Sequence, residues 1–416
     1  EVEQSIASWG DEGEIDLVDY CRVLTNFTSS HCLLGKEFRT GMTDEFARVY
    51  HALERGVTPI AYLNAHLPLP SFRARDKARI RLEEMVTKII SDRRASGREG
   101  EDFLQTLMDA RYKHGAPLTD YEITGMLIAA MFAGHHTSSV TTAWAIIELV
   151  RQPELLARVR EELESTFGGG EEVGFASLRN VPLTEATVLE ALRLHPPLFM
   201  LVRVAEKDFV YKDYFIEKGT WVIISPTVSH LLADTFPNPS KFELDRYLPG
   251  REEDKKIDFA YIPFGGGRHK CMGNAFAILQ VKAILSILLR RFDFSLNDPN
   301  VGSNFHGLVV GPEEPVRVKY KRRAQPAKVA TKPATPTGAA VEAPATTQKK
   351  FKVTVDLDLC QGHAACQGES PEIFRQIGVG KVRLLQATPD PSLRAKAEAA
   401  ERHCPTRAVR VTDLDD

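Results

Sequence analysis

The sequence predicts a mainly α-helical domain with small β-sheets, followed by a linker and a small α+β domain. Apolar residues recur at helical spacing along most of residues 1–321. Residues 322–350 are instead rich in Ala, Pro, Thr and Lys and hold almost no large apolar side chain, so they cannot form a core. Residues 351–416 carry two separated groups of cysteines and strand-like runs near both ends. We therefore expect two domains joined by a linker.

The composition excludes several classes of protein. Of the 416 residues, 43% are apolar and 26% are charged, with a formal net charge of −3, so nothing indicates a nucleic acid or an anionic membrane as partner. The longest apolar run, residues 126–134, is far shorter than the roughly 20 residues that cross a bilayer. No signal peptide precedes the first residues. We expect a cytoplasmic protein with no transmembrane anchor.

The six cysteines are irregularly spaced, which argues against a disulfide framework and for a reducing compartment. Four of them fall in patterns typical of metal ligands. The other two, Cys21 and Cys32, lie in a helical pattern, and we expect both to be small core residues.

Several segments have the apolar period of helices and end at Gly or Pro. The chain begins in what reads as the middle of an amphipathic helix, without a capping start. A capping box, Thr119 with Glu122, opens the longest helix, which extends to about Arg151. Further helices are expected at residues 17–34, 44–55, 72–94 and 102–112, from Thr184 onward, and from about 274 to 292.

Short alternating runs predict strands in the remaining segments. Residues 209–211 and 219–225 are expected to pair through a turn at Lys212-Asp213. The other strand-like or extended stretches are residues 196–203, 308–310 and 316–320.

The middle of the longest helix is polar where its surroundings are apolar. Residues 133–138 read AGHHTS, a glycine and four polar residues in a stretch that is otherwise core. Such residues cost stability in a buried helix, so they suggest a site rather than packing. The alternative is a hydrogen-bonded histidine pair in the core beside a tolerated glycine.

Residues 264–273 read FGGGRHKCMG and precede an apolar-periodic helix. A cysteine in a glycine-rich loop at the start of a helix gains backbone N–H donors and the positive end of the helix dipole, so Cys271 can serve as an anionic metal ligand. The glycines leave room for a flat prosthetic group against the main chain, and haem fits such a space. The alternative is a buried structural cysteine in a glycine-rich turn.

This stretch resembles F-x-x-G-x-[RH]-x-C-x-G, the haem-binding signature of the cytochrome P450 superfamily. The resemblance implies the haem-thiolate monooxygenase fold and haem b, with Cys271 as the iron ligand, whose thiolate favours O–O bond cleavage. Arg268, His269 and Arg203 would reach the haem propionates, although Arg203 has the alternative of being a surface residue. The other haem-binding residues that it implies are Phe264, Gly267 and Gly273.

The polar segment of the longest helix resembles a second motif of the superfamily, [AG]-G-x-[DE]-T, whose threonine handles dioxygen. Ala133, Gly134 and Thr137 match this motif, whereas His136 stands where an acid is usual. His-His-Thr-Ser is similar to the sterol 14α-demethylase branch, including its bacterial members. The resemblance implies that His136 delivers protons or hydrogen-bonds the substrate, since an imidazole titrates near neutral pH. The substrate-binding residues that it implies are Met131, Phe132, Ala133, His136, Leu198, Phe199, Met200 and Leu201.

Glu190 and Arg193 share one face of a helix at i, i+3 spacing, and Arg246 follows in the run FELDR. The three residues resemble the buried ion-pair triad of the superfamily, whose role is structural. Asp245 stands where a proline is frequent in that family.

The C-terminal domain carries CQGHAAC at residues 360–366 and a distant Cys404-Pro. This arrangement resembles bacterial-type ferredoxins, with His363 in place of the usual middle cysteine. The resemblance implies an iron–sulfur cluster on Cys360, Cys366 and Cys404, with the 3Fe-4S type favoured over 4Fe-4S, and it leaves open whether His363 is a ligand. A Cys₃His zinc site is the rival interpretation.

Together the two resemblances imply a sterol 14α-demethylase fused to its own ferredoxin, which removes the 14α-methyl group in three successive oxygenations. No dinucleotide-binding fingerprint appears, so a separate NAD(P)H-dependent ferredoxin reductase is expected to supply electrons. The early strands and helices of the family have no counterpart before Glu1, so we expect an N-terminally truncated haem domain. The alternatives are a haem-thiolate enzyme for another hydrophobic substrate and a non-catalytic haem and iron–sulfur electron-transfer protein.

Overall fold

The computed structural model divides the chain into two compact units. The first comprises Glu1–Pro263 and Ala277–Val329, and the second comprises Phe264–Phe276 and Ala330–Asp416. The structure describes all residues except 36–43, 59, 62–63, 98–99, 101, 113, 169–171, 306–307, 325–349, 358, 361, 363–364, 378–380, 403, 405–407 and 415–416. The predicted linker, residues 322–350, lies mostly outside the described residues.

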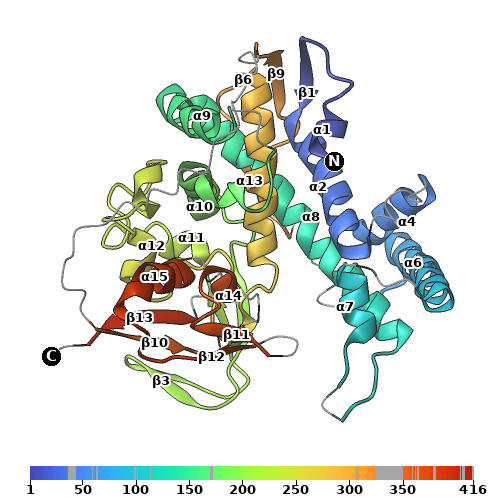
Figure 1. Cartoon of the computed structure of the whole chain (residues 1–416). Coiled ribbons are helices and arrows are strands. Elements are labelled where there is room, and N and C mark those ends of the chain that lie inside the picture. The colour runs from blue at the N-terminus through green and yellow to red at the C-terminus, as the bar shows by residue number, and fades with distance from the viewer. Residues whose placement is uncertain are drawn as a thin grey trace. The chain divides into compact units, whose positions relative to one another are not determined.

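The first unit is mainly helical, and the long predicted helices are confirmed to within a few residues (Figure 1). Its helices are α1 (Val2–Ser5), α2 (Leu17–Leu34), α4 (Asp44–Glu54), α6 (Pro70–Ser96), α7 (Phe103–Asp109), α8 (Asp120–Arg151), α9 (Pro153–Phe167), α10 (Pro182–Leu194), α11 (Pro226–Ser229) and α12 (Glu253–Lys256), with the 3₁₀ helices η1 (Ser177–Asn180) and η2 (Leu244–Tyr247). A further long helix, α13 (Asn274–Arg291), begins in the second unit and continues in the first. Within the described residues, no helix has both the length and the apolarity of a membrane-spanning segment.

Helix α8 is the central helix of the first unit. Its predicted capping box is confirmed, because the Glu122 amide donates to Thr119 Oγ1 at 3.3 Å and the Glu122 carboxylate accepts from the Thr119 amide at 2.8 Å. Every side chain from 138 to 149 is buried, as expected for a helix that is packed on all sides. The N-terminal half packs with α2, α4, α6 and α7 around a core that includes Phe46, Tyr50, Leu82, Ile90, Leu107 and Leu127.

The two cysteines of α2 differ in their surroundings. Cys21 is buried in the core as predicted, whereas Cys32 is exposed, so the prediction for Cys32 was wrong. Both residues lie on the same side of the helix, since eleven residues make about three turns. The elements that cover this side therefore stop before the end of α2.

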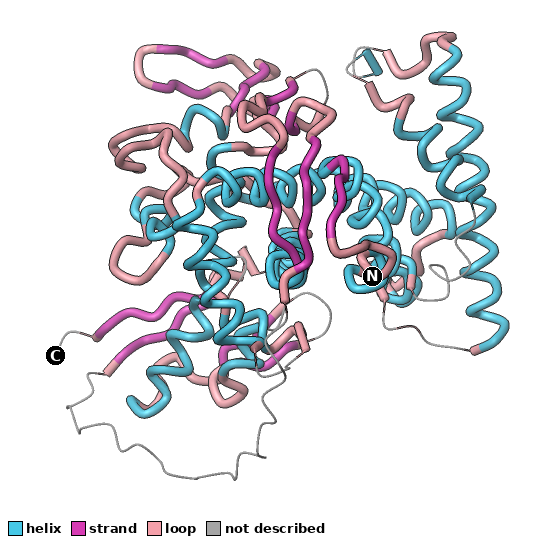
Figure 2. The backbone as a smooth tube through the Cα atoms, turned by 90° about the horizontal axis from the view of Figure 1, so that it is seen from above, coloured by secondary structure: helices cyan, strands magenta, loops and turns pink. Residues whose placement is uncertain are grey.

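A three-stranded antiparallel sheet has the order β1 (Glu12–Asp16), β9 (Arg317–Arg322) and β6 (Phe292–Leu296), as Figure 2 shows. The sequence did not predict β1, because EGEID does not alternate in polarity. The amphipathic helix expected at the start is limited to the short α1. After α1 the Trp9 ring stacks on Tyr320 of β9, with 4.4 Å between the ring centroids. This contact holds the start of the chain against the sheet.

The predicted turn at Lys212-Asp213 exists, but it joins strands other than those expected. It connects β3 (Phe209–Tyr211) with β4 (Tyr214–Ile216), while β5 (Trp221–Ile224) pairs with β2 (Leu201–Val204). Lys212 has φ of 54°, the left-handed conformation that favours a two-residue hairpin turn. A turn this short pairs only the residues directly beside it, so the pairing predicted between 209–211 and 219–225 was wrong.

The strand predicted at residues 308–310 was also wrong. The Val310 amide donates to the Pro197 carbonyl at 2.8 Å, so this backbone bonds to the segment after α10 rather than to a strand ladder. A short pair of strands lies on either side of it, β7 (Ser303–Asn304) and β8 (Gly311–Pro312). The strand predicted at 316–320 is confirmed as part of β9.

The predicted ion-pair triad is fully buried beside α10. Arg193 Nε lies 2.7 Å from Glu190 Oε2, and Arg246 Nε lies 3.1 Å from Glu190 Oε1. Glu253 is a fourth member that the sequence did not indicate, since its carboxylate lies 2.7 Å from Arg246 Nη1. Two buried carboxylates therefore face two buried guanidinium groups, and Tyr247 donates to Glu190 at 2.7 Å.

The same arginines also hold irregular backbone between α11 and η2. Arg193 donates to the carbonyls of His230, Pro239 and Lys241 at 2.9, 2.7 and 3.0 Å. Arg246 donates to the carbonyl of Asn238 at 2.9 Å. Because each guanidinium has five N–H donors, one side chain can satisfy a carboxylate and several carbonyls together.

The C-terminal part of the second unit, red in Figure 1, is a small α+β fold. Strand β10 (Phe351–Val355) pairs antiparallel with β13 (Val409–Asp413), so the two ends of the predicted domain lie together. The remaining elements are β11 (Phe374–Gln376), β12 (Val382–Leu384), α14 (Ala365–Glu369), η4 (Pro391–Leu393) and α15 (Arg394–Arg402). They enclose a core that includes Phe351, Val353, Phe374, Ala397, Ala400 and Val409.

Replacing Arg246 should strongly destabilise the first unit. The change Arg246→Ala removes the arginine that Glu190 and Glu253 share and leaves each buried carboxylate with one arginine, Arg193 and Arg251 respectively, and loss of one member of a buried ion pair costs about 3–5 kcal/mol. The free energy of unfolding in urea would measure this loss. The control, Arg81→Ala, removes a solvent-exposed ion pair with Glu45 and should change stability little. A loss for Arg246→Ala as small as that of the control would contradict the structural role.

Candidate functional site

The predicted cysteine stretch folds as a closed loop before α13. The Cys271 amide donates to the Phe264 carbonyl at 2.8 Å, and the 3₁₀ helix η3 (Gly267–His269) lies within the loop. Gly265 and Gly267 have φ of 69° and 64°, which residues with a side chain rarely adopt. A Cβ on Gly267 would meet nothing within 4 Å, so one face of the loop is open. Cys271 and His269 are exposed, and the Arg268 side chain lies outside what the structure describes.

The loop fits a thiolate ligand for a flat cofactor. Desolvation of the sulfur raises the pKa of Cys271, and this effect outweighs the opposing effects of the Gly273 amide and the Lys270 charge. The Gly273 amide donates to the sulfur and so favours its negative charge. A metal cation bound at the sulfur would favour the thiolate further. The open glycine face and the amide at the sulfur are both features that a haem held by Cys271 requires.

Arg203, the other predicted propionate contact, lies on β2 and is half-buried. Its Nη1 donates to the Val202 carbonyl at 2.9 Å, and among the described residues no carboxylate pairs with it. The neighbouring predicted residues alternate along the extended chain, with Leu198 and Met200 exposed and with Phe199 and Leu201 half-buried. The Phe199 ring packs edge-on against Phe305 at 5.6 Å.

The polar segment of α8 makes specific contacts with α2. Thr25 Oγ1 donates to the His135 carbonyl at 3.1 Å, and Ser29 Oγ donates to the Gly134 carbonyl at 3.4 Å. A Cβ at Gly134 would lie 3.6 Å from Ser29 Oγ, an ordinary van der Waals distance, so an alanine would fit there without moving α2. Thr137 Oγ1 donates to the Ala133 carbonyl at 2.7 Å, which leaves its lone pairs available as acceptors.

Glu54, at the end of α4, joins the two histidines of α8. His135 Nε2 lies 2.9 Å and His136 Nε2 lies 3.0 Å from Glu54 Oε1. The second carboxylate oxygen lies 3.9 Å from Nδ1 of His51, an exposed residue one turn earlier on α4. We call Glu54, His135 and His136 the His–His–Glu cluster. Sequence reasoning found the histidines but missed Glu54, which no short motif links to residues so far along the chain.

The electrostatics of the His–His–Glu cluster keep Glu54 ionised. Burial by itself raises the pKa of this carboxyl, but the two imidazoles beside it more than offset burial and lower the pKa from 4.5 to about 2. His135 Nδ1 lies 3.0 Å from the Met131 carbonyl, so it donates to that oxygen. The cluster therefore offers a fixed anion between two imidazoles.

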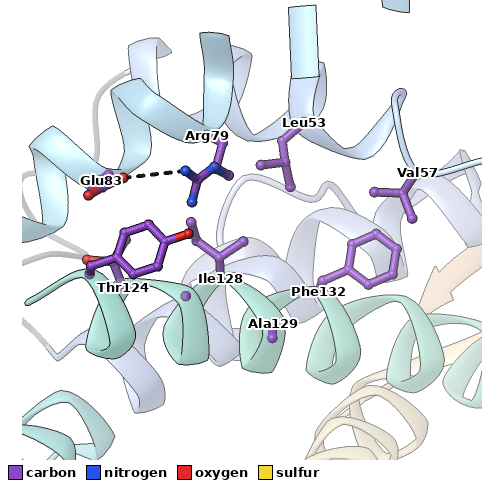
Figure 3. A pocket seen from close by; sticks show the side chains of 10 residues that line it. Leu53, Val57, Arg79, Glu83, Thr124, Ile128, Ala129 and Phe132 are labelled. Carbon is purple, nitrogen blue, oxygen red and sulfur yellow. Dashed lines mark ion pairs between the residues drawn. The ribbon is translucent and has the colours of Figure 1, made fainter. Parts of the chain in front are cut away.

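A cavity of about 330 Å³ lies between α4, α6 and α8, as Figure 3 shows. Apolar side chains make up most of its walls, and Arg79 faces Glu83 across 4.0 Å at one end. Phe132, one of the predicted substrate-binding residues, lines this cavity. Met131 does not, because its side chain lies in the core between the same helices. The apolar lining includes Leu53, Val57, Ile128 and Ala129.

The three cysteines of the C-terminal part lie around one small core. Cys360 and Cys366 are buried and Cys404 is half-buried. Burial, with a smaller contribution from the neighbouring Cys404 and Cys360, raises the pKa of Cys366 to about 11. The Ala408 amide donates to Cys404 Sγ at 3.2 Å, as amides commonly do to metal-bound thiolates. His363, the predicted fourth candidate, lies outside the described residues.

Comparison with known proteins identifies the family. The family model described as cytochrome P450 matches residues 3–320. The chain belongs to the cytochrome P450 family. Sterol 14α-demethylases of Mycolicibacterium vanbaalenii and Mycobacterium tuberculosis are each 44% identical to this P450, over 78% of the chain and 73% of the relatives. Obtusifoliol 14-alpha demethylase of Sorghum bicolor is 42% identical, over 78% of the chain and 67% of that protein.

Solved structures agree with this assignment. Cyanobacterial CYP120A1 with retinoic acid bound has a TM-score of 0.70 and 25% identity, covering 77% of this P450 and 73% of that chain. The haem domain of cytochrome P450DA has a TM-score of 0.70 and 25% identity, covering 78% and 72%. The predicted mainly helical P450 fold is confirmed, and the chain is an oxidoreductase of the haem monooxygenase type.

The C-terminal part matches a second family model. Residues 353–411 match the 4Fe-4S single cluster domain. The predicted fusion of a P450 with a ferredoxin is confirmed, and an iron–sulfur cluster is its implied cofactor.

Glu54 should make the stability of the first unit depend on pH in the acid range. Because its pKa is about 2 in the folded protein and 4.5 is its ordinary value, its contribution is fully present above about pH 4.5 and is lost as pH falls toward 2. Urea unfolding of wild type and Glu54→Gln at pH 6 and pH 3 would measure this. Wild type should lose more unfolding free energy than Glu54→Gln between pH 6 and pH 3. Equal losses would contradict the lowered pKa of Glu54.

Proposed function

We propose that this P450 is a sterol 14α-demethylase that receives electrons from its own ferredoxin domain. The observation that carries the proposal is the 44% identity of the chain to sterol 14α-demethylases. In addition, His136 of α8 lies 3.0 Å from Glu54 and directly precedes Thr137. An acid is usual at the position of His136 in the P450 motif that this segment resembles, whereas His-His-Thr-Ser is similar to the sterol 14α-demethylase branch.

The proposed organisation is a haem domain at residues 1–321, a linker at 322–350 and a ferredoxin domain at 351–416. Because the two domains belong to one chain, the haem domain would meet its ferredoxin at a higher effective concentration than it would meet a separate donor. Electrons would pass from NAD(P)H through a separate ferredoxin reductase to the cluster and then to haem. The cysteines, none of which forms a disulfide among the described residues, favour a reducing cytoplasmic setting.

The loop residues of the haem domain would bind the cofactor. Cys271 would provide the thiolate to iron, with Phe264, Gly267 and Gly273 shaping the loop around it. His269, Arg268 and Arg203 would meet the propionates, and Arg203 suits this role because it has no carboxylate partner among the described residues. Bound haem supplies the activation of dioxygen that an unreactive methyl group requires.

The His–His–Glu cluster would deliver protons. Each oxygenation consumes one dioxygen, two electrons and two protons, so the three rounds that take the methyl group to alcohol, aldehyde and finally formate need six protons. His51 is exposed and faces one Glu54 oxygen at 3.9 Å, while His136 faces the other at 3.0 Å. Because 3.9 Å is longer than a hydrogen bond, a proton would pass from His51 to Glu54 through an intervening water and then to His136, next to Thr137. The Thr137 hydroxyl, with its proton directed to Ala133, would accept and orient rather than donate.

The substrate would lie along apolar residues at α8 and the start of β2. Phe132 and Ala133 belong to the same stretch of α8 as His136, and Phe132 already lines a cavity. The other proposed contacts are Met131, Leu198, Phe199, Met200 and Leu201. A rigid, mostly apolar sterol is a suitable partner for such surfaces.

Replacing His136 should separate dioxygen consumption from product formation. With a sterol substrate and a ferredoxin reductase, His136→Ala should consume dioxygen but form about 10²-fold less product, at the low end of what proton-transfer groups contribute. Product and dioxygen would be measured in the same reaction. His114→Ala, an exposed histidine away from the cluster, is the matched control.

The carbon monoxide difference spectrum of the reduced protein should be the same for wild type and both variants, because Cys271 is unchanged. Unaltered coupling in His136→Ala would refute proton delivery by this residue. Absence of turnover with a panel of sterols, but turnover of another apolar compound, would refute the sterol assignment.

The cluster of the ferredoxin domain should contain three iron atoms. We favour the 3Fe-4S type because Cys360, Cys366 and Cys404 are the only cysteines of this domain. Total iron, haem and acid-labile sulfide would be measured in the same sample. After the haem iron is subtracted, the remaining iron and the sulfide should stand in a ratio of three to four. A ratio of one to one in wild type, with less iron per sulfide in His363→Ala, would instead establish a 4Fe-4S cluster with His363 as ligand.

A further inference from the structure

The His–His–Glu cluster has the ligand set of a transition-metal site. We propose that Glu54, His135 and His136 bind zinc or a similar divalent cation, in addition to the haem and the iron–sulfur cluster. Two imidazoles and one carboxylate are a combination that zinc uses in proteins, and imidazole ligands suit zinc, copper and nickel.

The distances within the cluster are close to those that zinc requires. Each residue offers one ligand atom, and the three atoms lie within 4.8 Å of one another. Nitrogen and oxygen ligands at about 2.0–2.2 Å from a tetrahedral zinc ion lie about 3.3–3.5 Å apart. The His135 and His136 contacts to Glu54 Oε1, at 2.9 and 3.0 Å, need to lengthen by only a few tenths of an ångström.

His135 already has the second hydrogen bond that metal-binding histidines usually make. A carbonyl can only accept, so the 3.0 Å contact to Met131 favours a hydrogen on His135 Nδ1 over the longer contact of 3.4 Å in which the Tyr50 hydroxyl would donate to that nitrogen. Its Nε2 then faces a carboxylate oxygen, and either a second proton or a metal ion must lie between the two atoms. Donation from the other ring nitrogen to a backbone carbonyl fixes the tautomer and orients Nε2 as a ligand.

Glu54 Oε1 is the least satisfied atom of the cluster. It is buried, and among the described residues no donor reaches it with regular hydrogen-bond geometry, although both Nε2 atoms are near. A buried carboxylate oxygen without a well-directed donor is costly. A cation between Oε1 and the two nitrogens would satisfy all three atoms at once.

The neighbours of the cluster allow a metal to enter and to stay. The His136 side chain is 25% exposed, which leaves a route from solvent, while His135 is 2% exposed and fixed in the core. The Phe132 ring packs edge-on against His136 at 5.0 Å, and Tyr50 packs against His135 at 5.5 Å. Burial raises the pKa of Tyr50, so it stays a neutral phenol and does not compete as a ligand.

Metal binding would have a consequence for turnover, and this consequence rests on the proposed function. Zinc on both imidazoles and on Glu54 removes the groups that would pass protons to the oxygenation site. We expect zinc to lower the product formed per dioxygen consumed, and a chelator to restore it. Binding itself does not depend on the substrate, so failure of sterol turnover would leave the binding test unaffected.

The test uses the full chain with haem and cluster in place, titrated with zinc chloride alone. The titration should saturate at about one zinc per chain. X-ray absorption at the zinc edge should then show nitrogen and oxygen ligands at about 2.0–2.1 Å, with the scattering typical of imidazole. Glu54→Gln and His136→Ala should each weaken binding at least tenfold in equilibrium dialysis. Glu83→Gln, which alters a carboxylate on the neighbouring α6, is the matched control and should bind as wild type does.

Sulfur ligands at about 2.3 Å would overturn the proposal, because zinc would then occupy cysteines. Unchanged affinity in both cluster variants would overturn it as well. Circular dichroism checks whether each variant is folded. Where a variant is not folded, the zinc ligands that X-ray absorption shows in the wild-type protein decide whether the His–His–Glu cluster binds zinc.

Discussion

A polar segment in the middle of a buried helix is costly unless neighbouring elements supply partners for its polar atoms. In α8 most of these partners come from two sides, although the buried Ser138 hydroxyl has none among the described residues. Thr25 and Ser29 of α2 donate to carbonyls of the segment, and Glu54 of α4 binds both imidazoles. The order of helices around α8 thus follows from the need to satisfy these atoms as much as from apolar packing.

The two proposed cofactor sites would use cysteine in the same electrostatic way. Desolvation raises the pKa of both Cys271 and Cys366, so at each site the thiolate would form together with the bound cation. Backbone amides at Cys271 and Cys404 then stabilise negative charge on sulfur. The charge of the sulfur and the binding of the cofactor would therefore depend on each other at both sites, although the loop around Cys271 and the segments around the ferredoxin cysteines have unrelated local folds.

The sequence was informative where a single local pattern determines the structure. Helical periodicity and the Thr119 capping box gave α2 and α8 nearly to the residue, and short motifs identified Cys271 and the Glu190–Arg193 pair. It was less informative where distant segments decide the outcome. The pairing of β5 with β2 and the strand β1 depend on partners far along the chain, which no local period reveals. Glu54 and Glu253 belong to the same class, because each gains its role from contacts that the fold creates.

The arginine contacts beside α10 have a consequence for how this region can vary. Arg193 and Arg246 fasten the irregular segment before η2 through its main-chain carbonyls, at His230, Asn238, Pro239 and Lys241. A carbonyl is present whatever the side chain, so these hydrogen bonds by themselves do not depend on residue type. Two positions of the segment have further requirements, because the His230 ring accepts from the Ile262 amide at 2.9 Å and Asn238 has φ of 52°, which few residue types adopt. At Lys241, whose side chain is exposed, we expect substitutions to leave the path of the backbone unchanged.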